Sequence, residues 1–240
     1  MQYLMGRRRL PAASRTPFST HSLVKEGNLQ MNRLMYRVNT TPLPVQIEAR
    51  HYTMPKLDVY VPVVTGGQTP PAALGAMNRQ ISGNVRMLLQ EQGYGTNPLT
   101  DTTGSFEIKT NQRHVLSLSL INYAYSGGAH GNTLIRSLTF DTATGKSYSL
   151  RELFKPGSNY VERLSAHVAA QIKSRGIPVL YDFKSIRPDQ DYYIADKALV
   201  LYFQLYELTP YVYGFPYFPI SVYAIQDIVD EQGPLGRMLS

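Results

Sequence analysis

The sequence contains no cysteine and no tryptophan among its 240 residues. Without thiols the chain cannot form a disulfide bond, a zinc–thiolate site or a cysteine nucleophile. The absence of cysteine does not indicate a compartment, because such a protein is compatible with either side of a membrane. No run approaches the ~18 apolar residues of a membrane span. No apolar stretch follows the basic residues 7–9 as it would in a signal peptide, so the residues alone favour the cytoplasm as the default location.

The net charge of +7 is concentrated near the N-terminus. Eight of the 24 basic residues but only two of the 17 acidic ones lie in residues 1–50, which leaves 16 basic and 15 acidic groups in the other 190. The folded part therefore lacks the basic stripe that nucleic-acid binding requires. Residues 1–44 are interpreted as an irregular basic arm, with Met31 and Met35 as alternatives to Met1 for the translation start. A solvated tail is favoured over contact with phosphate or anionic lipid.

Hydrophobic patterning predicts an α+β fold, with a mostly antiparallel sheet and helices packed on one side of it. Alternating residues predict an edge strand that Pro62 closes, and a hairpin turn at Asn111 and Gln112. Further strands are expected by the same pattern at residues 106–110, 115–125, 134–140, 192–195, 198–203 and 218–224.

Two helices are expected from apolar residues spaced three or four apart. The first begins at residues 70–71, where prolines suit a first turn, and ends at Gly93. The second begins at Ser158 and ends at Gly176. Ser149 and Glu152, three residues apart, predict a capping box before a short helical segment.

No catalytic motif of useful specificity is present. The five histidines show no metal-binding spacing, and no Gly-x-Ser-x-Gly elbow presents a nucleophile. Any two acids, such as Glu207 and Asp227, could be paired as in glycoside hydrolases, so such a pairing is uninformative. The sequence therefore predicts no metal, no cofactor and no enzymatic activity.

The most distinctive local run is Gly-Gly-Ala-His-Gly at residues 127–131. Gly127 and Gly128 could offer backbone amides to an anion, and His130 could act as a base or a ligand. However, the glycine spacing is not that of a phosphate-binding loop, and no helix follows. The favoured interpretation is a bulge or crossing between strands, with His130 hydrogen-bonded inside. Ligand binding by these three residues is the alternative hypothesis.

Aromatic residues are dense towards the C-terminus. Residues 181–223 hold nine tyrosines and four phenylalanines, and residues 210–219 hold five aromatic residues among three prolines. Tyrosine has a rigid apolar ring with a polar tip, which suits both protein hot spots and stacking on sugars. Strand alternation would turn half of these rings inward. The candidate binding residues in this segment are Tyr211, Tyr213, Phe215, Tyr217 and Phe218.

Several stretches recur in the same order in a known family. They are residues 57–64, 76–81, 123–131, 139–141, 145–146, 150–154 and 206–211 with Gly214. Over about residues 45–229 the chain resembles the paired domains of unknown function, families 4163 and 3298, of anti-sigma-V ectodomains and of some peptidoglycan deacetylases. On this resemblance residues 45–125 form a first domain and 126–230 a second, together one compact unit, and 231–240 form a tail.

The resemblance implies an extracellular or envelope-associated binding or sensing module without enzymatic activity, of the kind that anti-sigma relatives use to recognise lysozyme. The expected partner is a protein or a peptidoglycan-type glycan, while the oligomeric state is left open. Two alternatives from other classes stay open. One is a metal-assisted hydrolase or deacetylase with a site around His130, and the other is an intracellular structural or interaction domain.

Overall fold

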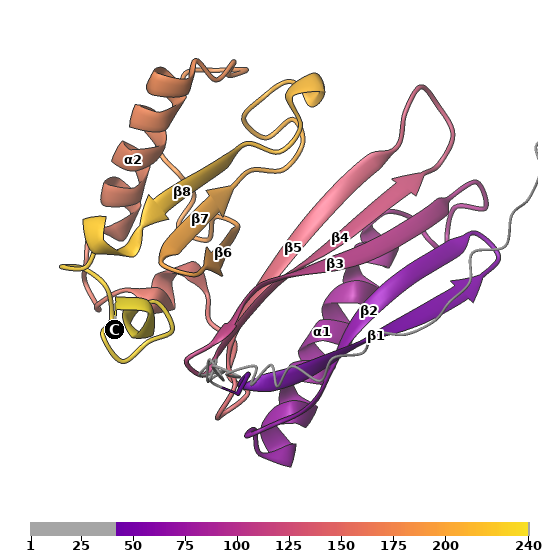
Figure 1. The fold of residues 1–240 in the computed structure, drawn as a ribbon. Coiled ribbons are helices and arrows are strands. Elements are labelled where there is room, and N and C mark those ends of the chain that lie inside the picture. The colour runs from indigo at the N-terminus through magenta and orange to yellow at the C-terminus, as the bar shows by residue number, and fades with distance from the viewer. Residues whose placement is uncertain (1–41, 240) are drawn as a thin grey trace, which may run out of the picture. The chain divides into compact units, whose positions relative to one another are not determined.

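The computed structural model describes residues 42–239, which contain two β-sheets (Figure 1). The first sheet has the strand order β1-β2-β3-β4-β5, and the second has the order β6-β7-β8. All strand pairs are antiparallel except β2 with β3. The predicted α+β class with mostly antiparallel strands is confirmed. The first five strands are β1 (Val45–Met54), β2 (Leu57–Gly67), β3 (Asp101–Gln112), β4 (Val115–Tyr125) and β5 (Asn132–Asp141). The last three are β6 (Tyr192–Ala195), β7 (Ala198–Tyr202) and β8 (Tyr217–Ser221).

The hairpin between β3 and β4 turns at Arg113 and His114, where φ is +52° and +59°. The predicted turn at Asn111 and Gln112 was therefore wrong, because both residues belong to β3 and pair with β4. A two-residue turn with positive φ at both positions matches the twist of the strands, but its usual signature is asparagine or glycine. Because arginine and histidine stand at these positions instead, the sequence did not indicate the turn.

Strand β2 lies between β1 and β3, so the prediction of an edge strand closed by Pro62 was wrong. The strand continues through Pro62 to Gly67. Its parallel pairing with β3 covers only Leu57–Val59. Beyond that point the β3 side of β2 has no strand partner among the described residues, which is the situation in which a sheet tolerates proline.

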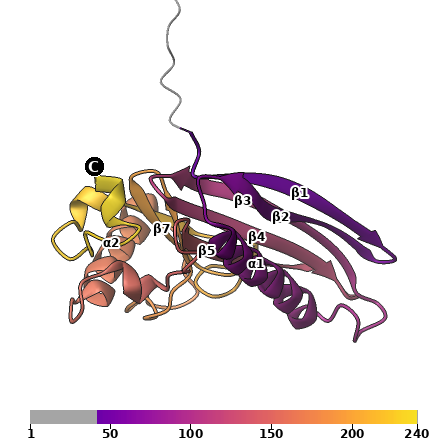
Figure 2. The same ribbon diagram turned by 90° about the horizontal axis from the view of Figure 1, so that it is seen from below.

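Helix α1 (Pro71–Glu91) covers one face of the five-stranded sheet (Figure 2). Its predicted apolar stripe is confirmed, because Met77, Ile81 and Leu88 are buried against the leucines of β4. The alternation of leucine and serine in β4 directs Leu116 and its companions towards this helix. No helix within residues 42–239 is long and apolar enough to cross a membrane.

The second sheet packs against helix α2 (Tyr160–Arg175), which lies beside β8 in Figure 1. The N-cap of the helix is Asn159, one residue after the predicted start at Ser158. The helix ends as predicted at Gly176, where φ is +61°. The predicted capping box is confirmed before the short helix η1 (Leu150–Leu153), where the Glu152 carboxylate accepts the Ser149 amide hydrogen at 2.9 Å.

The two sheets meet through hydroxyl groups. The Thr110 hydroxyl donates to the Ile194 carbonyl at 2.9 Å and accepts the Asp196 amide hydrogen at 3.0 Å. The Ser117 hydroxyl accepts the Ile194 amide hydrogen at 3.0 Å. Serine and threonine side chains of β3 and β4 thus satisfy backbone groups of β6 that no neighbouring strand pairs. The predicted family boundary at residue 125 falls between β4 and β5, and that division stays a prediction.

Candidate binding site

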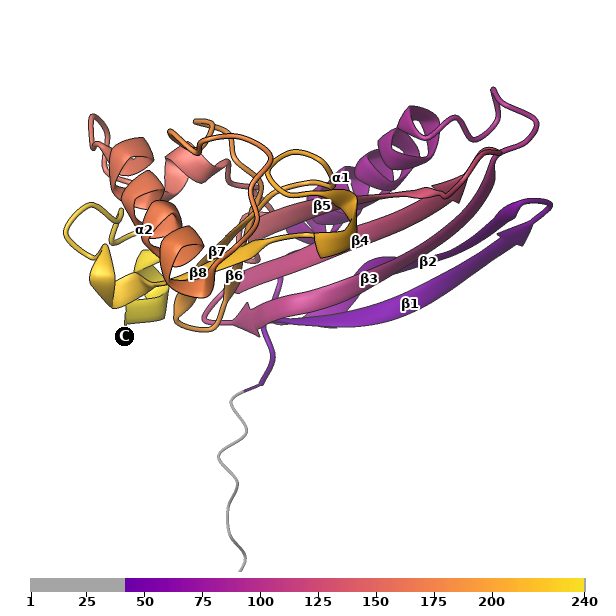
Figure 3. The same cartoon turned by 90° about the horizontal axis from the view of Figure 1, so that it is seen from above.

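The loop between β4 and β5 meets the connection between β7 and β8 through three aromatic rings. The rings of His130 and Tyr211 are stacked, with centroids 4.2 Å apart and planes inclined by 25°. The Tyr206 ring lies 5.5 Å from that of Tyr211, and its hydroxyl is 3.5 Å from Nε2 of His130. We call His130, Tyr206 and Tyr211 the aromatic cluster. Figure 3 shows the connection after β7 passing over the first sheet, as these contacts require.

Hydrogen bonds to the β4–β5 loop fix the cluster. Nδ1 of His130 is 2.8 Å from the Gly131 carbonyl, which also accepts the Tyr211 hydroxyl at 3.2 Å. Because a carbonyl only accepts, Nδ1 carries the proton, and in the neutral ring Nε2 accepts from Tyr206. The Tyr125 hydroxyl donates to the Gly128 carbonyl at 2.9 Å. Each ring therefore has a defined orientation.

Tyr206 has a left-handed backbone, with φ of +64°. A non-glycine residue in this region carries backbone strain, which persists only where its surroundings hold it. Glu207 supplies that restraint. Its carboxylate accepts hydrogen bonds from the backbone amide of Gln204 at 2.7 Å and from the side-chain amide of Gln190 at 3.2 Å. It also forms an ion pair with Arg187.

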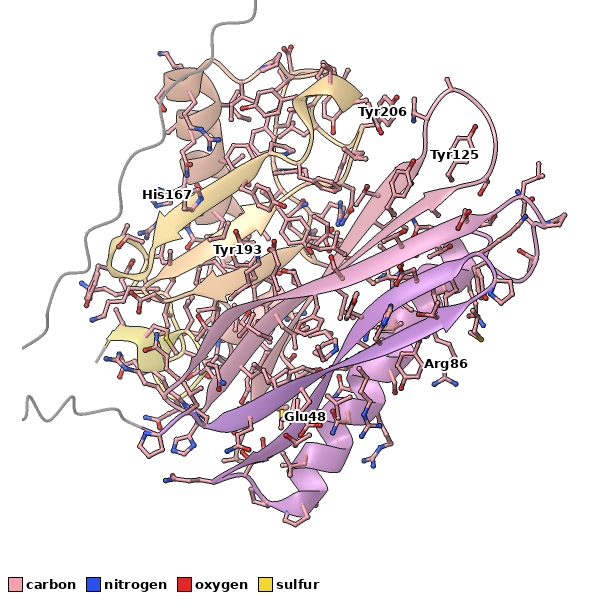
Figure 4. The ribbon with its side chains drawn as sticks, turned by 45° about the vertical axis from the view of Figure 1, so that its right-hand side comes forward. Glu48, Arg86, Tyr125, His167, Tyr193 and Tyr206 are labelled. Atoms are coloured by element: carbon pink, nitrogen blue, oxygen red, sulfur yellow. The ribbon has the colours of Figure 1, made fainter. Side chains whose placement is uncertain are left out.

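The cluster is continued by exposed tyrosines. Tyr206 is 54% exposed, Tyr123 42% and Tyr125 39%. Figure 4 labels Tyr125, the last residue of β4, close to Tyr206 of the β7–β8 connection. Gly131 lies so close to the Tyr123 ring that a Cβ atom there would overlap it. A glycine at this position thus allows the close approach of the ring.

A polar cleft of about 400 Å³ adjoins the cluster. It is lined by Glu91 at the end of α1, by Gln92 directly after it, and by Ser126, His130 and Asn132. The Gln92 side chain donates to the Asn132 carbonyl at 2.8 Å and to the Asn122 carbonyl at 3.1 Å, so α1 is tied to β4 and β5 there.

A second cleft of about 330 Å³ shares Glu91 with the first and is lined further by Arg136, Asp191 and Gln204. Arg136 forms an ion pair with Glu91. Burial raises the pKa of Asp191, while the hydrogen bond from Gln204 at 3.0 Å and the charge of Arg187 oppose this rise. The charges in this cleft are therefore largely engaged with one another.

The predicted residues of the β4–β5 loop lie at the surface. Gly127 and Gly128 adopt φ of +87° and +108° and are exposed. His130 is exposed as well, so the expectation that it is hydrogen-bonded inside the fold was wrong. The His130 ring stacks on Tyr211, which is distant in the sequence, and the histidine stays at the surface.

The predicted aromatic residues divide between surface and core. Tyr211 joins the cluster, Tyr213 is 38% exposed, and Phe215 is half-buried. Tyr217 is half-buried near Tyr193 and Tyr202, and burial raises its pKa to about 12. Phe218 is fully buried, which corrects the prediction that its ring contacts a partner. It lies in β8, where alternation turns it into the core.

The acids considered for catalysis have other roles. Glu207 restrains the Tyr206 loop, and Asp227 forms a two-oxygen ion pair with Arg163 at 2.8 and 3.2 Å. Within residues 42–239 no three histidine or acidic side chains are grouped to hold a metal ion. Sequence reasoning missed Tyr206 as a site residue, and its only signal was a second tyrosine five residues before Tyr211.

Two family models match separate parts of the chain. The model "Deacetylase PdaC" matches residues 55–133, and the model "Protein of unknown function (DUF3298)" matches residues 151–223. The first segment contains Tyr123, Tyr125 and His130, and the second contains Tyr206 and Tyr211. The two matched segments therefore meet at the aromatic cluster.

Two solved structures are similar to the chain. A DUF3298 family protein from Pseudomonas aeruginosa is 17% identical with a TM-score of 0.57, and the match covers 79% of this chain and 95% of that one. A member of the same family from Bacteroides fragilis is 12% identical with a TM-score of 0.58, covering 82% and 98%. These likenesses define the fold. A comparison with curated proteins found no match.

Proposed function

We propose that the chain is a non-catalytic binding or sensing module of bacterial cell-envelope type, with the aromatic cluster as its contact surface. The observation that carries this proposal is the strained, exposed Tyr206, whose ring lies 5.5 Å from that of Tyr211, which itself stacks on His130. Strain of this kind is retained where the surroundings enforce it, often at binding sites. Exposed tyrosines that are already oriented bind with little further loss of conformational freedom.

The envelope assignment is supported by the two family models, one of which carries the name of a deacetylase. The sequence also resembles the outer part of anti-sigma-V factors, which suggests recognition of a lysozyme-like protein. The alternative ligand is a cell-wall glycan, since tyrosine rings suit both protein hot spots and sugars. A hydrolytic role around His130 has less support, because its contacts are with tyrosines and its own loop.

The test measures binding of the purified chain to hen lysozyme by biolayer interferometry and to insoluble peptidoglycan by co-sedimentation. We expect retention on at least one, and a loss of at least tenfold in affinity, about 1.4 kcal/mol, on Tyr206→Ala. Tyr52→Ala is the matched control, because Tyr52 is 45% exposed on β1 and should leave binding unchanged. Folded protein that binds neither ligand contradicts the proposal.

A further inference from the structure

We infer that the ligand of this site is an uncharged oligosaccharide of several pyranose units, which stacks on the aromatic cluster and continues along the two polar clefts. This inference rests on the proposed binding function and specifies its ligand. It is argued from the shape of the clefts, from their hydrogen-bonding groups and from their charge.

The shape favours a small, elongated ligand. The first cleft includes His130 in its lining, so it begins at the aromatic cluster itself. Its volume of about 400 Å³ lies in the range of small-molecule sites, and the second cleft of about 330 Å³ shares Glu91 and Leu134 with it. Two clefts that share lining residues offer more room than one sugar ring needs. A chain of rings can enter both clefts, which a flat protein surface cannot do.

The hydrogen-bonding groups suit hydroxyl-rich rings. The Asn132 side chain is exposed at the mouth of the first cleft, and no partner for its amide is found within residues 42–239. The Tyr206 hydroxyl lies 3.5 Å from Nε2 of His130, which lines the same cleft. The Gln92 side-chain amide, also in the lining, is held by the backbone carbonyls of Asn122 and Asn132. An aromatic ring can pack against the apolar face of a pyranose, while amide and hydroxyl groups at the edge of the ring form hydrogen bonds with the sugar hydroxyls.

The charge excludes strongly anionic polymers. Glu91, Arg136 and Asp191 line the second cleft, and Arg187 lies 3.7 Å from the Asp191 carboxylate, so each of the two carboxylates has a guanidinium partner. Arg136 is occupied by its ion pair with Glu91. A phosphate- or uronate-rich chain would have to compete with these carboxylates for both guanidinium groups. An uncharged sugar chain meets no such penalty.

The experiment titrates the purified chain with N-acetylglucosamine, its tetramer and cellotetraose by isothermal calorimetry, with tetragalacturonate as the anionic tetramer. Binding of either neutral tetramer at least tenfold more tightly than the monosaccharide supports the inference, since only a chain reaches the second cleft. Comparison of the two neutral tetramers separates recognition of acetamido groups from recognition of the rings alone. Tighter binding of tetragalacturonate overturns the inference.

Variants test the stacking. Tyr206→Ala should weaken tetramer binding at least tenfold, whereas Tyr206→Phe keeps the ring and should stay within about threefold of the parent. Equal losses in both variants overturn the role given to the ring. If lysozyme is retained but neither neutral tetramer binds, the inference fails while the proposed function stands. If neither lysozyme, peptidoglycan nor a tetramer binds, both fail.

Discussion

The phenol ring of Tyr211 lies face to face with the imidazole of His130, with centroids 4.2 Å apart. The two residues come from loops on different sheets, since His130 follows β4 and Tyr211 follows β7. An aromatic pair of this kind contributes about 0.5–1.5 kcal/mol beyond its buried area. The stack therefore joins the loops and sets the position of the surface that we propose for binding.

Gly131→Ala should displace the Tyr123 ring, because a Cβ atom at this buried glycine would overlap it. The ring is 42% exposed and can swing outwards, so we expect a stability loss near the lower end of the ~1–3 kcal/mol range for overpacking. Chemical denaturation measures the loss, and NMR shifts of the Tyr123 ring report its movement. Gly83→Ala is the control. It lies within α1 with no atom near the added Cβ, and should raise stability by up to about 1 kcal/mol. An unchanged Tyr123 spectrum in Gly131→Ala contradicts the packing described.

Glu207→Ala should weaken ligand binding although Glu207 is not expected to touch the ligand. Its carboxylate holds the Gln204 amide, Gln190 and Arg187, and these contacts restrain Tyr206 in its left-handed conformation. Without them we expect a tenfold or larger rise in Kd for whichever ligand binds. Comparison of Tyr206→Gly with Tyr206→Ala tests the strain separately, because both lose the ring and only glycine adopts positive φ readily, so the glycine variant should be the more stable of the two. The idea fails if Glu207→Ala binds like the parent.

Ser117→Ala should destabilise the chain by about 1–3 kcal/mol, because it leaves the Ile194 amide of β6 without its partner at the junction of the sheets. Thr110→Val, which keeps the side-chain volume, should have a similar effect. The measurement is urea unfolding at neutral pH. Ser105→Ala, at an exposed position of β3, is the matched control and should change stability by less than ~0.5 kcal/mol.

The stability of the chain should fall in acid partly through Glu152. Hydrogen bonds from the Ser149 amide and from Lys146 lower the pKa of Glu152 to about 2, from an ordinary value of 4.5. A lowered pKa means that the folded state favours the carboxylate, so this contribution is present above pH 4.5 and is lost as the pH falls towards 2. The side chain is 43% exposed, and solvent screening keeps the effect below about 1 kcal/mol. In unfolding curves at pH 6 and pH 3, Glu152→Gln should lose less stability between the two pH values than the parent. Equal losses would contradict the role of the carboxylate.

Local patterns predicted much of the fold. The spacing of Met77, Ile81 and Leu88 indicated the buried face of α1, and the leucines of β4 indicated the side of the sheet that faces it. The capping box at Ser149 was also legible, because it depends on residues three apart. Each of these features is decided within a few residues of the chain.

Features that depend on distant partners were not predictable in this way. The position of the His130 ring is set by its contact with Tyr211, and no residue near His130 in the sequence indicates that partner. Tyr206 adopts positive φ because Glu207 is held by Arg187 and Gln190, and tyrosine has no intrinsic preference for that conformation. The junction between the two sheets likewise depends on hydroxyl contacts that Thr110 and Ser117 make with a strand about 80 residues further along the chain.

Each matched segment supplies only some rings of the aromatic cluster, so the two loops would have to be exchanged together between relatives. A chimera that took the β4–β5 loop from a relative but kept its own β7–β8 connection would leave His130 or Tyr211 without its counterpart. Grafting both loops together would transfer the whole aromatic cluster. The binding specificity of such a chimera would thus depend on both loops and not on either loop alone.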